Sequence, residues 1–225
     1  MNPKIEGSGF WIEENIFSEV ECDHLLENLS GFSGKRRRAG ARHLMSHPTI
    51  AALALDERLL EIARRALGRN AVPYRATLFE KSISARWLVV WHQDRALPLE
   101  AQFNLPDWGP WSLKAGVTYA PAPEWALSRI IALRIHLDNS VEDNGPLRII
   151  AGSHVAGVMS EKEILAYAGA RQPLECLIGR GGVLAMRPLL IHSSAKPHSN
   201  RPRRVLHIEY ADGLDLAPGI RLAIA

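Results

Sequence analysis

Cysteine is scarce in this chain of 225 residues: Cys22 and Cys176 are the only two, and they lie far apart in the sequence. Since no CxxC pair occurs, the sequence excludes a disulfide framework and a zinc site built on thiolates, and it indicates a reducing compartment. No run of 18 uncharged apolar residues occurs, and the first ten residues contain no apolar signal core. We therefore expect a cytoplasmic protein that does not enter a membrane.

Several catalytic and binding motifs are absent as well. The chain has no glycine-rich phosphate loop, no serine nucleophile elbow and no HExxH motif. The net charge is only +3, and the basic run KRRR at 35–38 has no interleaved aromatic residues, which a base-stacking groove needs. A solvated loop is the favoured interpretation of this run over an anion site. We expect a small-molecule substrate and no nucleic-acid partner.

Helical patterns fill the first third of the chain, and short strand patterns fill most of the rest. Ser18 and Glu21 form a predicted capping box for a helix over 18–29, and apolar repeats at three and four predict a second helix over 49–67. After Pro73 come short runs rich in β-branched or aromatic residues, namely TLFEKSI, RWLVVW, RIIALRIHL, PLRII, GGVLAM, LLIH and RRVLHIEY. This order predicts a mainly β protein with flanking helices, built as a barrel or jelly roll.

The predicted organisation is one domain over residues 1–225. Its helical part covers about 1–70 and its jelly-roll core about 71–212. Residues 98–124 carry five prolines and two tryptophans within that core. Long insertions of this kind are often functional, so we expect a lid here.

Two His-x-Asp pairs are the main candidates for chemistry. Residues two apart on an extended chain point to the same face, so each pair can reach a single metal ion. His92 and Asp94 end the apolar run WLVVWHQD, where a loop is expected to begin. His136 and Asp138 lie inside a strand pattern, where an ion-paired face or a polar lining is the favoured interpretation. His92 and Asp94 are therefore the preferred metal pair.

A third ligand is expected from a distant strand. The apolar pattern LLIH ends at His192, and two histidines with one carboxylate form the set favoured for non-haem Fe(II) with open positions. The next strand pattern begins with Arg203, whose guanidinium can hold a carboxylate through two parallel hydrogen bonds. A bulge would exchange Arg203 with Arg204, so both remain candidates. His207 is expected to be a packed residue.

These pieces together resemble the phytanoyl-CoA dioxygenase family. The resemblance is carried by WHQD at 91–94, NGPLRIIAGSH at 144–154, the strand ending at His192, and an arginine eleven residues later. It runs from about Phe79 to Tyr210. It implies a double-stranded β-helix (a cupin-like jelly roll) that uses Fe(II) and 2-oxoglutarate.

The resemblance also implies roles for individual residues. His92, Asp94 and His192 would be the iron ligands, Arg203 would hold the distal carboxylate of 2-oxoglutarate, and Ser194 would assist it. Arg134 stands where the family has a tryptophan, so it is expected at the co-substrate pocket.

The implied reaction is oxidation of a small metabolite by O2, with release of succinate and CO2. Asp94 favours hydroxylation, because halogenating members lack this carboxylate; acyl-CoA specificity is not expected. Arg42, Arg134 and His136 are candidates to meet a polar or anionic substrate. Trp87, Trp91, Trp108 and Trp111 are candidates for the pocket wall or for plain core.

Two other classes remain open from the sequence. One is a cupin-like enzyme that uses Zn(II) or Mn(II) for hydrolysis or isomerisation and does not use 2-oxoglutarate. The other is a non-catalytic, ligand-binding jelly roll.

Overall fold

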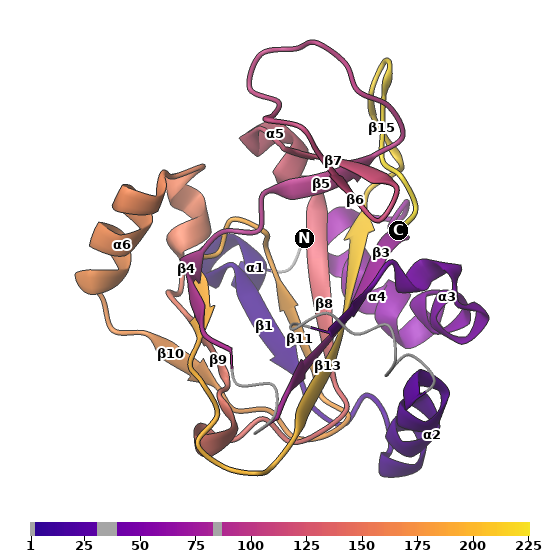
Figure 1. Ribbon diagram of the computed structural model, residues 1–225, viewed down its shortest axis with the longest axis vertical. Helices are drawn as coiled ribbons and strands as arrows, with labels where there is room; N and C mark the ends of the chain where they lie inside the picture. Colours follow the sequence, from indigo (N-terminus) through magenta and orange to yellow (C-terminus); the bar gives the residue numbers. More distant parts are fainter. Residues whose placement is uncertain (1–2, 31–39, 83–86) are drawn as a thin grey trace.

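Two antiparallel sheets form the centre of the protein (Figure 1). The structure is a computed structural model, and it describes residues 3–30, 40–82 and 87–225. The major sheet has the strand order β1 (Phe10–Glu13), β11 (Val183–Met186), β8 (Ile130–His136), β13 (Arg203–Ala211), β3 (Val72–Lys81) and β2 (Gly40–Arg42). The minor sheet has the order β10 (Leu174–Cys176), β9 (Leu147–Ile149), β12 (His192–Ser194) and β4 (Val89–His92). The mainly β prediction is confirmed.

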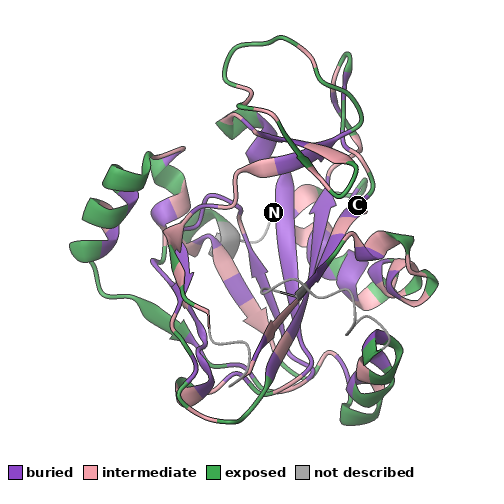
Figure 2. Ribbon diagram, viewed as in Figure 1, coloured by how far each residue is buried: buried purple, intermediate pink, exposed green. Residues whose placement is uncertain are grey.

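Side-chain alternation gives the major sheet one apolar face and one polar face. On β13, Leu206, Ile208 and Tyr210 are fully buried in a cluster with residues from the N-terminal helices. These helices are α2 (Glu19–Ser30), α3 (Pro48–Ala54) and α4 (Glu57–Leu67). Figure 2 shows the central strands as mostly buried and the outward surface of α2 as exposed. The polar face of β13 therefore looks toward the minor sheet.

The predicted first helix is confirmed, and its capping box forms as expected. The Ser18 amide donates to the Glu21 carboxylate at 2.8 Å, and the Glu21 amide donates to Ser18 Oγ at 3.3 Å. The single helix predicted over 49–67 is wrong, because α3 and α4 are separate. Asp56 breaks the run: it adopts an extended conformation and accepts the Arg58 amide at 2.9 Å as the N-cap of α4.

Other elements also differ from the sequence-based expectation. The first third of the chain, expected to be helical, also supplies β1 and β2 to the two edges of the major sheet. The strand-rich part contains α6 (Glu161–Gly169), which covers the outer face of the minor sheet by packing Ile164 against Ile150 and Ile191. A further helix, α1, covers Pro3–Ser8.

The insertion at 98–124 contains a small sheet of its own, at the top in Figure 1. Its strand order is β5 (Ala96–Leu99), β7 (Val117–Pro121) and β6 (Ser112–Lys114), and α5 (Glu124–Leu127) follows. Phe103 holds the loop between β5 and β6 through edge-on contacts with Trp108 and Trp111, at 5.1 and 5.0 Å between ring centres. The function of this segment as a lid stays a prediction.

The chain ends in a hairpin of β14 (Asp215–Ala217) and β15 (Ile220–Arg221). Three short 3₁₀ helices cover Leu44–Ser46, Glu142–Asn144 and Ser153–Ala156. Among the described residues, no helix combines the length and the apolar character that a membrane span needs. The basic run at 35–38 lies outside the described residues.

Candidate metal centre

Strands β4 and β12 bring three potential metal ligands together. His92 ends β4 and His192 begins β12, and the two residues stand opposite each other in the antiparallel ladder. Asp94 follows two residues after His92, where its amide donates to the Pro188 carbonyl at 2.9 Å. The ligand atoms of these three side chains all lie within 4.8 Å of one another. Within the described ranges, this is the one such group of three.

The geometry presents two imidazole nitrogens and one carboxylate to a common point. His92 Nε2 lies 3.7 Å from Asp94 Oδ1, and His192 Nε2 lies 3.5 Å from Asp94 Oδ2. Each Nδ1 lies 2.8 Å from a carbonyl two residues earlier, that of Val90 for His92 and that of Leu190 for His192. Because a carbonyl only accepts, each Nδ1 carries the proton, and the Nε2 lone pair is directed toward the carboxylate.

The pKa shifts of Asp94 and His192 favour the forms that bind a metal ion, whereas the shift of His92 favours the protonated ring. Burial and the neighbouring His92 lower the pKa of His192 to about 3. Burial opposes ionisation of Asp94, but His192 and His92 outweigh it and hold the pKa of this carboxyl well below its usual range. Burial likewise opposes protonation of His92, yet Asp94 outweighs it and raises its pKa. Two imidazoles and one carboxylate on one side of an ion match the set that non-haem Fe(II) takes.

The side chains of the second His-x-Asp pair, His136 and Asp138, do not form a common metal site. Asp138 accepts two hydrogen bonds from the Arg204 guanidinium, at 2.7 and 2.6 Å, and one from the Arg204 amide at 2.8 Å. His136 is buried, and neither of its ring nitrogens has a hydrogen-bond partner in the described part of the chain. Burial and the nearby Arg134 hold its pKa well below its usual range. The ion-paired interpretation therefore describes Asp138, while His136 lines the interior.

Arg203 points into the space between the sheets, and Arg204 points away. The Arg203 side chain is 3% exposed and donates to Ser194 Oγ at 3.3 Å. Its Nε and Nη1 have no hydrogen-bond partner among the described residues. Burial and the neighbouring Arg134 lower its pKa to about 9. Arg204 is paired with Asp138, so of these two described arginines Arg203 is the one with unpartnered donors in the interior.

Lys81 is a buried cation at this site that the sequence analysis missed. It stands opposite Arg203 in the ladder between β3 and β13, and it is 1% exposed. Its ammonium donates to Ser194 Oγ at 2.5 Å and also to the Ser194 and Ala195 carbonyls. Burial, then Arg203 and Arg134, lower its pKa to about 7. The one available signal was its alternation with Thr77 and Phe79 in TLFEKSI.

Gly145 allows the chain beyond β12 to approach this cluster. It adopts φ of 72°, and a Cβ here would lie 2.6 Å from the Ala195 carbonyl. Its own carbonyl accepts the Ser194 hydroxyl at 3.0 Å. The NG turn therefore needs glycine to bring Ser194 beside Lys81.

A row of polar groups continues along the inner face. Arg134 is 5% exposed, lies 3.1 Å from His207 Nδ1 and stacks over the Phe79 ring at 5.3 Å. His207 Nε2 lies 3.3 Å from the Glu209 carboxylate, which also pairs with Arg75. His207 is a packed residue outside the metal group, as expected.

None of the four candidate tryptophans lines the pocket that opens beside Asp94. Trp87 contacts Phe79 at 6.4 Å between ring centres, and Arg148 stacks on Trp91 at 5.4 Å. Trp108 and Trp111 pack in the insertion. Thr77 and Phe79 line the pocket instead. Trp87 also faces the Lys81 ammonium, which lies 5.1 Å from its ring centre, so it borders the Lys81 end of the interior. A wall role for the tryptophans stays a prediction.

Comparison with known proteins gives one family match and several similar folds. Residues 9–205 match the family Phytanoyl-CoA dioxygenase (PhyH). EctD from S. alaskensis, in its apoform, has a TM-score of 0.70 at 20% identity, over 92% of this chain and 74% of EctD. HygX from Streptomyces hygroscopicus, with nickel and 2-oxoglutarate bound, has a TM-score of 0.66 at 18% identity, over 92% of this chain and 83% of HygX.

A third similar structure is SnoN, a non-haem α-ketoglutarate-dependent epimerase from nogalamycin biosynthesis. Its TM-score is 0.68 at 12% identity, over 94% of this chain and 81% of SnoN. No curated protein sequence matches the chain. The structural likenesses define the fold as a double-stranded β-helix with its flanking helices. Because the family match spans most of the sequence, the chain belongs to the phytanoyl-CoA dioxygenase family.

Proposed function

We propose that this protein is an Fe(II)- and 2-oxoglutarate-dependent oxygenase that hydroxylates an aliphatic C–H bond of a small molecule. The observation that carries the proposal is a pair of unpartnered donors on Arg203, in the same interior as the His92, Asp94 and His192 group. Buried guanidinium donors without acceptors are costly, and a carboxylate ligand would satisfy both. A metal-dependent hydrolase has no need of this second site.

The similar structures support the choice of cofactors. EctD was crystallised with Fe, and separately with 2-oxoglutarate and 5-hydroxyectoine. HygX was crystallised with iron, and with nickel and 2-oxoglutarate. The donor set of this chain fits the same group, since both histidines are oriented with Nε2 free and Asp94 is ionised.

The residues divide between the two cofactors. His92, Asp94 and His192 would hold iron, while Arg203, Ser194 and Lys81 would hold the distal carboxylate of 2-oxoglutarate, with Arg134 beside them. Iron with 2-oxoglutarate supplies activation of O2, for the overall reaction R–H + 2-oxoglutarate + O2 → R–OH + succinate + CO2.

The chain itself supplies position and shelter. The Val90 and Leu190 carbonyls fix the imidazole rings, and the interior around Arg203 is shielded from bulk solvent, since Lys81 and Ser194 are at most 2% exposed. Rigid placement of this kind lowers the entropic part of the barrier. Since Asp94 supplies a third protein ligand, we propose hydroxylation as the outcome. A product heavier than its substrate by one oxygen atom would separate this from an epimerisation such as that of SnoN.

The test is a spectroscopic titration. Anaerobic addition of Fe(II) and 2-oxoglutarate to the protein is expected to give the weak visible charge-transfer band of the iron–keto-acid chelate. Asp94→Ala and His192→Ala are expected to remove the band, whereas Asp138→Asn, which alters the other His-x-Asp pair, should retain it. Persistence of the band in both ligand variants would contradict the assignment. Substrate-stimulated succinate release then separates an oxygenase from a Zn(II) or Mn(II) hydrolase.

A further inference from the structure

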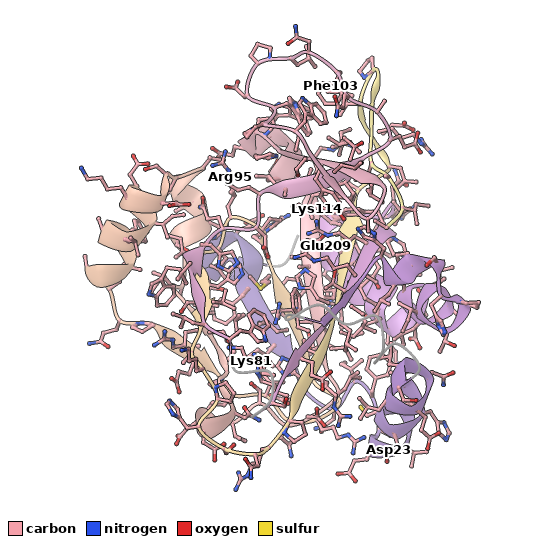
Figure 3. The ribbon with its side chains drawn as sticks, in the orientation of Figure 1. Asp23, Lys81, Arg95, Phe103, Lys114 and Glu209 are labelled. Carbon is pink, nitrogen blue, oxygen red and sulfur yellow. The ribbon has the colours of Figure 1, made fainter. Side chains whose placement is uncertain are left out.

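A pocket of about 230 Å³ opens beside Asp94, between the inner face of β3 and the insertion. Thr77 and Phe79 form its floor, and Lys114 and Tyr119 reach it from β6 and β7. Figure 3 shows Lys114 and Arg95 well above Lys81, in the direction of the insertion. The pocket is therefore separate from the Arg203 end of the interior, yet it shares Asp94 with the metal centre.

The pocket walls carry four cations from four separate segments. They are Arg42 on β2, Arg75 on β3, Arg95 after β4, and Lys114 on β6. Arg75 already has an anionic partner, since it pairs with Glu209, and it donates to the Ala96 carbonyl at 2.8 Å. Among the described residues, the other three cations have no partner of opposite sign.

No described carboxylate pairs with Arg42, Arg95 or Lys114. Arg95 Nε is buried and has no hydrogen-bond partner in the described residues. The Lys114 ammonium faces the Tyr119 ring at 4.8 Å from its centre. Burial, then Arg42 and Arg75, lower the pKa of Lys114. The cations thus repel one another, and a bound anion would relieve that repulsion.

The two carboxylates beside this pocket, those of Glu209 and Asp94, already have partners within the protein. Glu209 is held by Arg75 and His207. Asp94 lies between His92 and His192. The pocket therefore has an excess of positive charge that the protein does not balance itself.

We propose that the substrate carries an oxyanion, which Arg95, Lys114 and Arg42 bind while the carbon to be oxidised faces Asp94. The role of that carbon rests on the proposed function; the anion site does not. A volume of about 230 Å³ lies below the usual range for drug-sized ligands, so the substrate is a small metabolite bearing a carboxylate, phosphate or sulfate group. Because Lys114 comes from β6, the insertion takes part in selecting the substrate.

The test uses sulfate as the probe and the metal-free chain of 225 residues. Calorimetric titrations at constant ionic strength, balanced with sodium chloride, compare wild type with Lys114→Gln and Arg95→Gln. Each substitution is expected to weaken sulfate binding at least fivefold. Lys162→Gln, an exposed lysine on α6, is the matched control and should bind as wild type does. Methyl phosphate and acetate in the same titration decide which oxyanion the pocket prefers.

Two results would overturn the proposal. One is sulfate binding no tighter than chloride. The other is binding that Arg203→Ala abolishes and the two pocket variants leave intact, since that would place the anion at the co-substrate end. The titration needs no iron, so a failure of the Fe(II)–2-oxoglutarate band would leave it interpretable. Conversely, a protein that shows the band and binds no sulfate would retain the proposed function and lose this substrate class.

Discussion

The two faces of β13 differ sharply although both are buried. Leu206, Ile208 and Tyr210 are fully buried on the outer face, and on the inner face Arg203, His207 and Glu209 are at most 3% exposed. The outer residues pack against helices and stabilise the fold in proportion to the apolar area they bury. Inner groups instead carry a desolvation cost that only partners or ligands offset. Stability and chemistry are thus separated across a single strand.

The two ends of the inner face differ in how far the protein balances their charges. Glu209 has Arg75 and His207 as partners, so this cluster is balanced within the protein. At the other end, Arg203, Lys81 and Arg134 lie close together, and no carboxylate contributes to the pKa of Lys81. An unbalanced buried cluster opposes folding. We infer that it persists because a dianionic co-substrate balances it.

Removing the guanidinium of Arg203 is expected to have the largest effect in this comparison. In Arg203→Ala, binding of 2-oxoglutarate should weaken by about 2–5 kcal/mol, the usual loss when one partner of a buried charge pair is truncated. Titration of the charge-transfer band under anaerobic conditions measures this. The free energy of unfolding should change little, because the arginine has few partners to lose.

Arg204→Ala is the matched control on the same strand. Its guanidinium pairs with Asp138 on the other face, so affinity for 2-oxoglutarate should stay within twofold of wild type. If Arg204→Ala bound 2-oxoglutarate weakly and Arg203→Ala bound it as wild type does, the two residues would have exchanged roles in solution.

Truncating the outer face should give the opposite result. Leu206→Ala removes a fully buried side chain from the contact with the helices, and a loss of about 2–5 kcal/mol in the free energy of unfolding is expected. Urea denaturation measures it. Leu113→Ala on β6, where the side chain is 73% exposed, should change stability by less than about 0.5 kcal/mol. If Leu206→Ala weakened 2-oxoglutarate binding in the folded protein, the two faces would not be independent.

The lowered pKa of Lys81 predicts that binding of 2-oxoglutarate at the inner face depends on pH. Its pKa is about 7, so it is protonated below that pH and largely neutral above it. A dianion binds the protonated form better, so the Kd for 2-oxoglutarate should be flat below pH 7. Above pH 7 it should rise by up to about tenfold per pH unit.

Band titrations from pH 6.5 to 8.5 at saturating iron test this rise. Arg203, with a pKa of about 9, stays largely charged over that range. Lys81→Met should flatten the profile. A flat profile in wild type would exclude Lys81 from the binding of the co-substrate.

The meeting of His92, Asp94 and His192 could be predicted from the sequence because its signals are local. A spacing of two places His92 and Asp94 on one face, and the apolar run before His192 marks a strand end. Alternation along β13 predicts that Arg203 points inward. The register irregularity between β13 and β3 lies between Glu209 and Tyr210, so it does not exchange Arg203 with Arg204.

The missed features depend on pairing between distant segments. Lys81 became part of the site only through its register with Arg203, more than 120 residues away. Strand β1 is only four residues long and pairs with β11 near the other end of the chain, so its own pattern carried little information. Arg95 and Lys114 meet because the insertion folds back onto β3. The local periodicity of a sequence does not predict contacts between segments that lie far apart in the chain.

The smallest predicted effect concerns Asp56, which divided the helix expected over 49–67. Its carboxylate caps α4 by accepting the Arg58 amide and holds the Arg58 guanidinium as well. Asp56→Ala should lower the free energy of unfolding by about 1 kcal/mol, as for the loss of other N-caps. Asp56→Asn should recover most of it, because the amide oxygen also caps. Affinity for 2-oxoglutarate should be unchanged in both variants, since α4 packs on the outer face. If Asp56→Ala bound 2-oxoglutarate more weakly, the helices would position the interior residues as well as stabilise the fold.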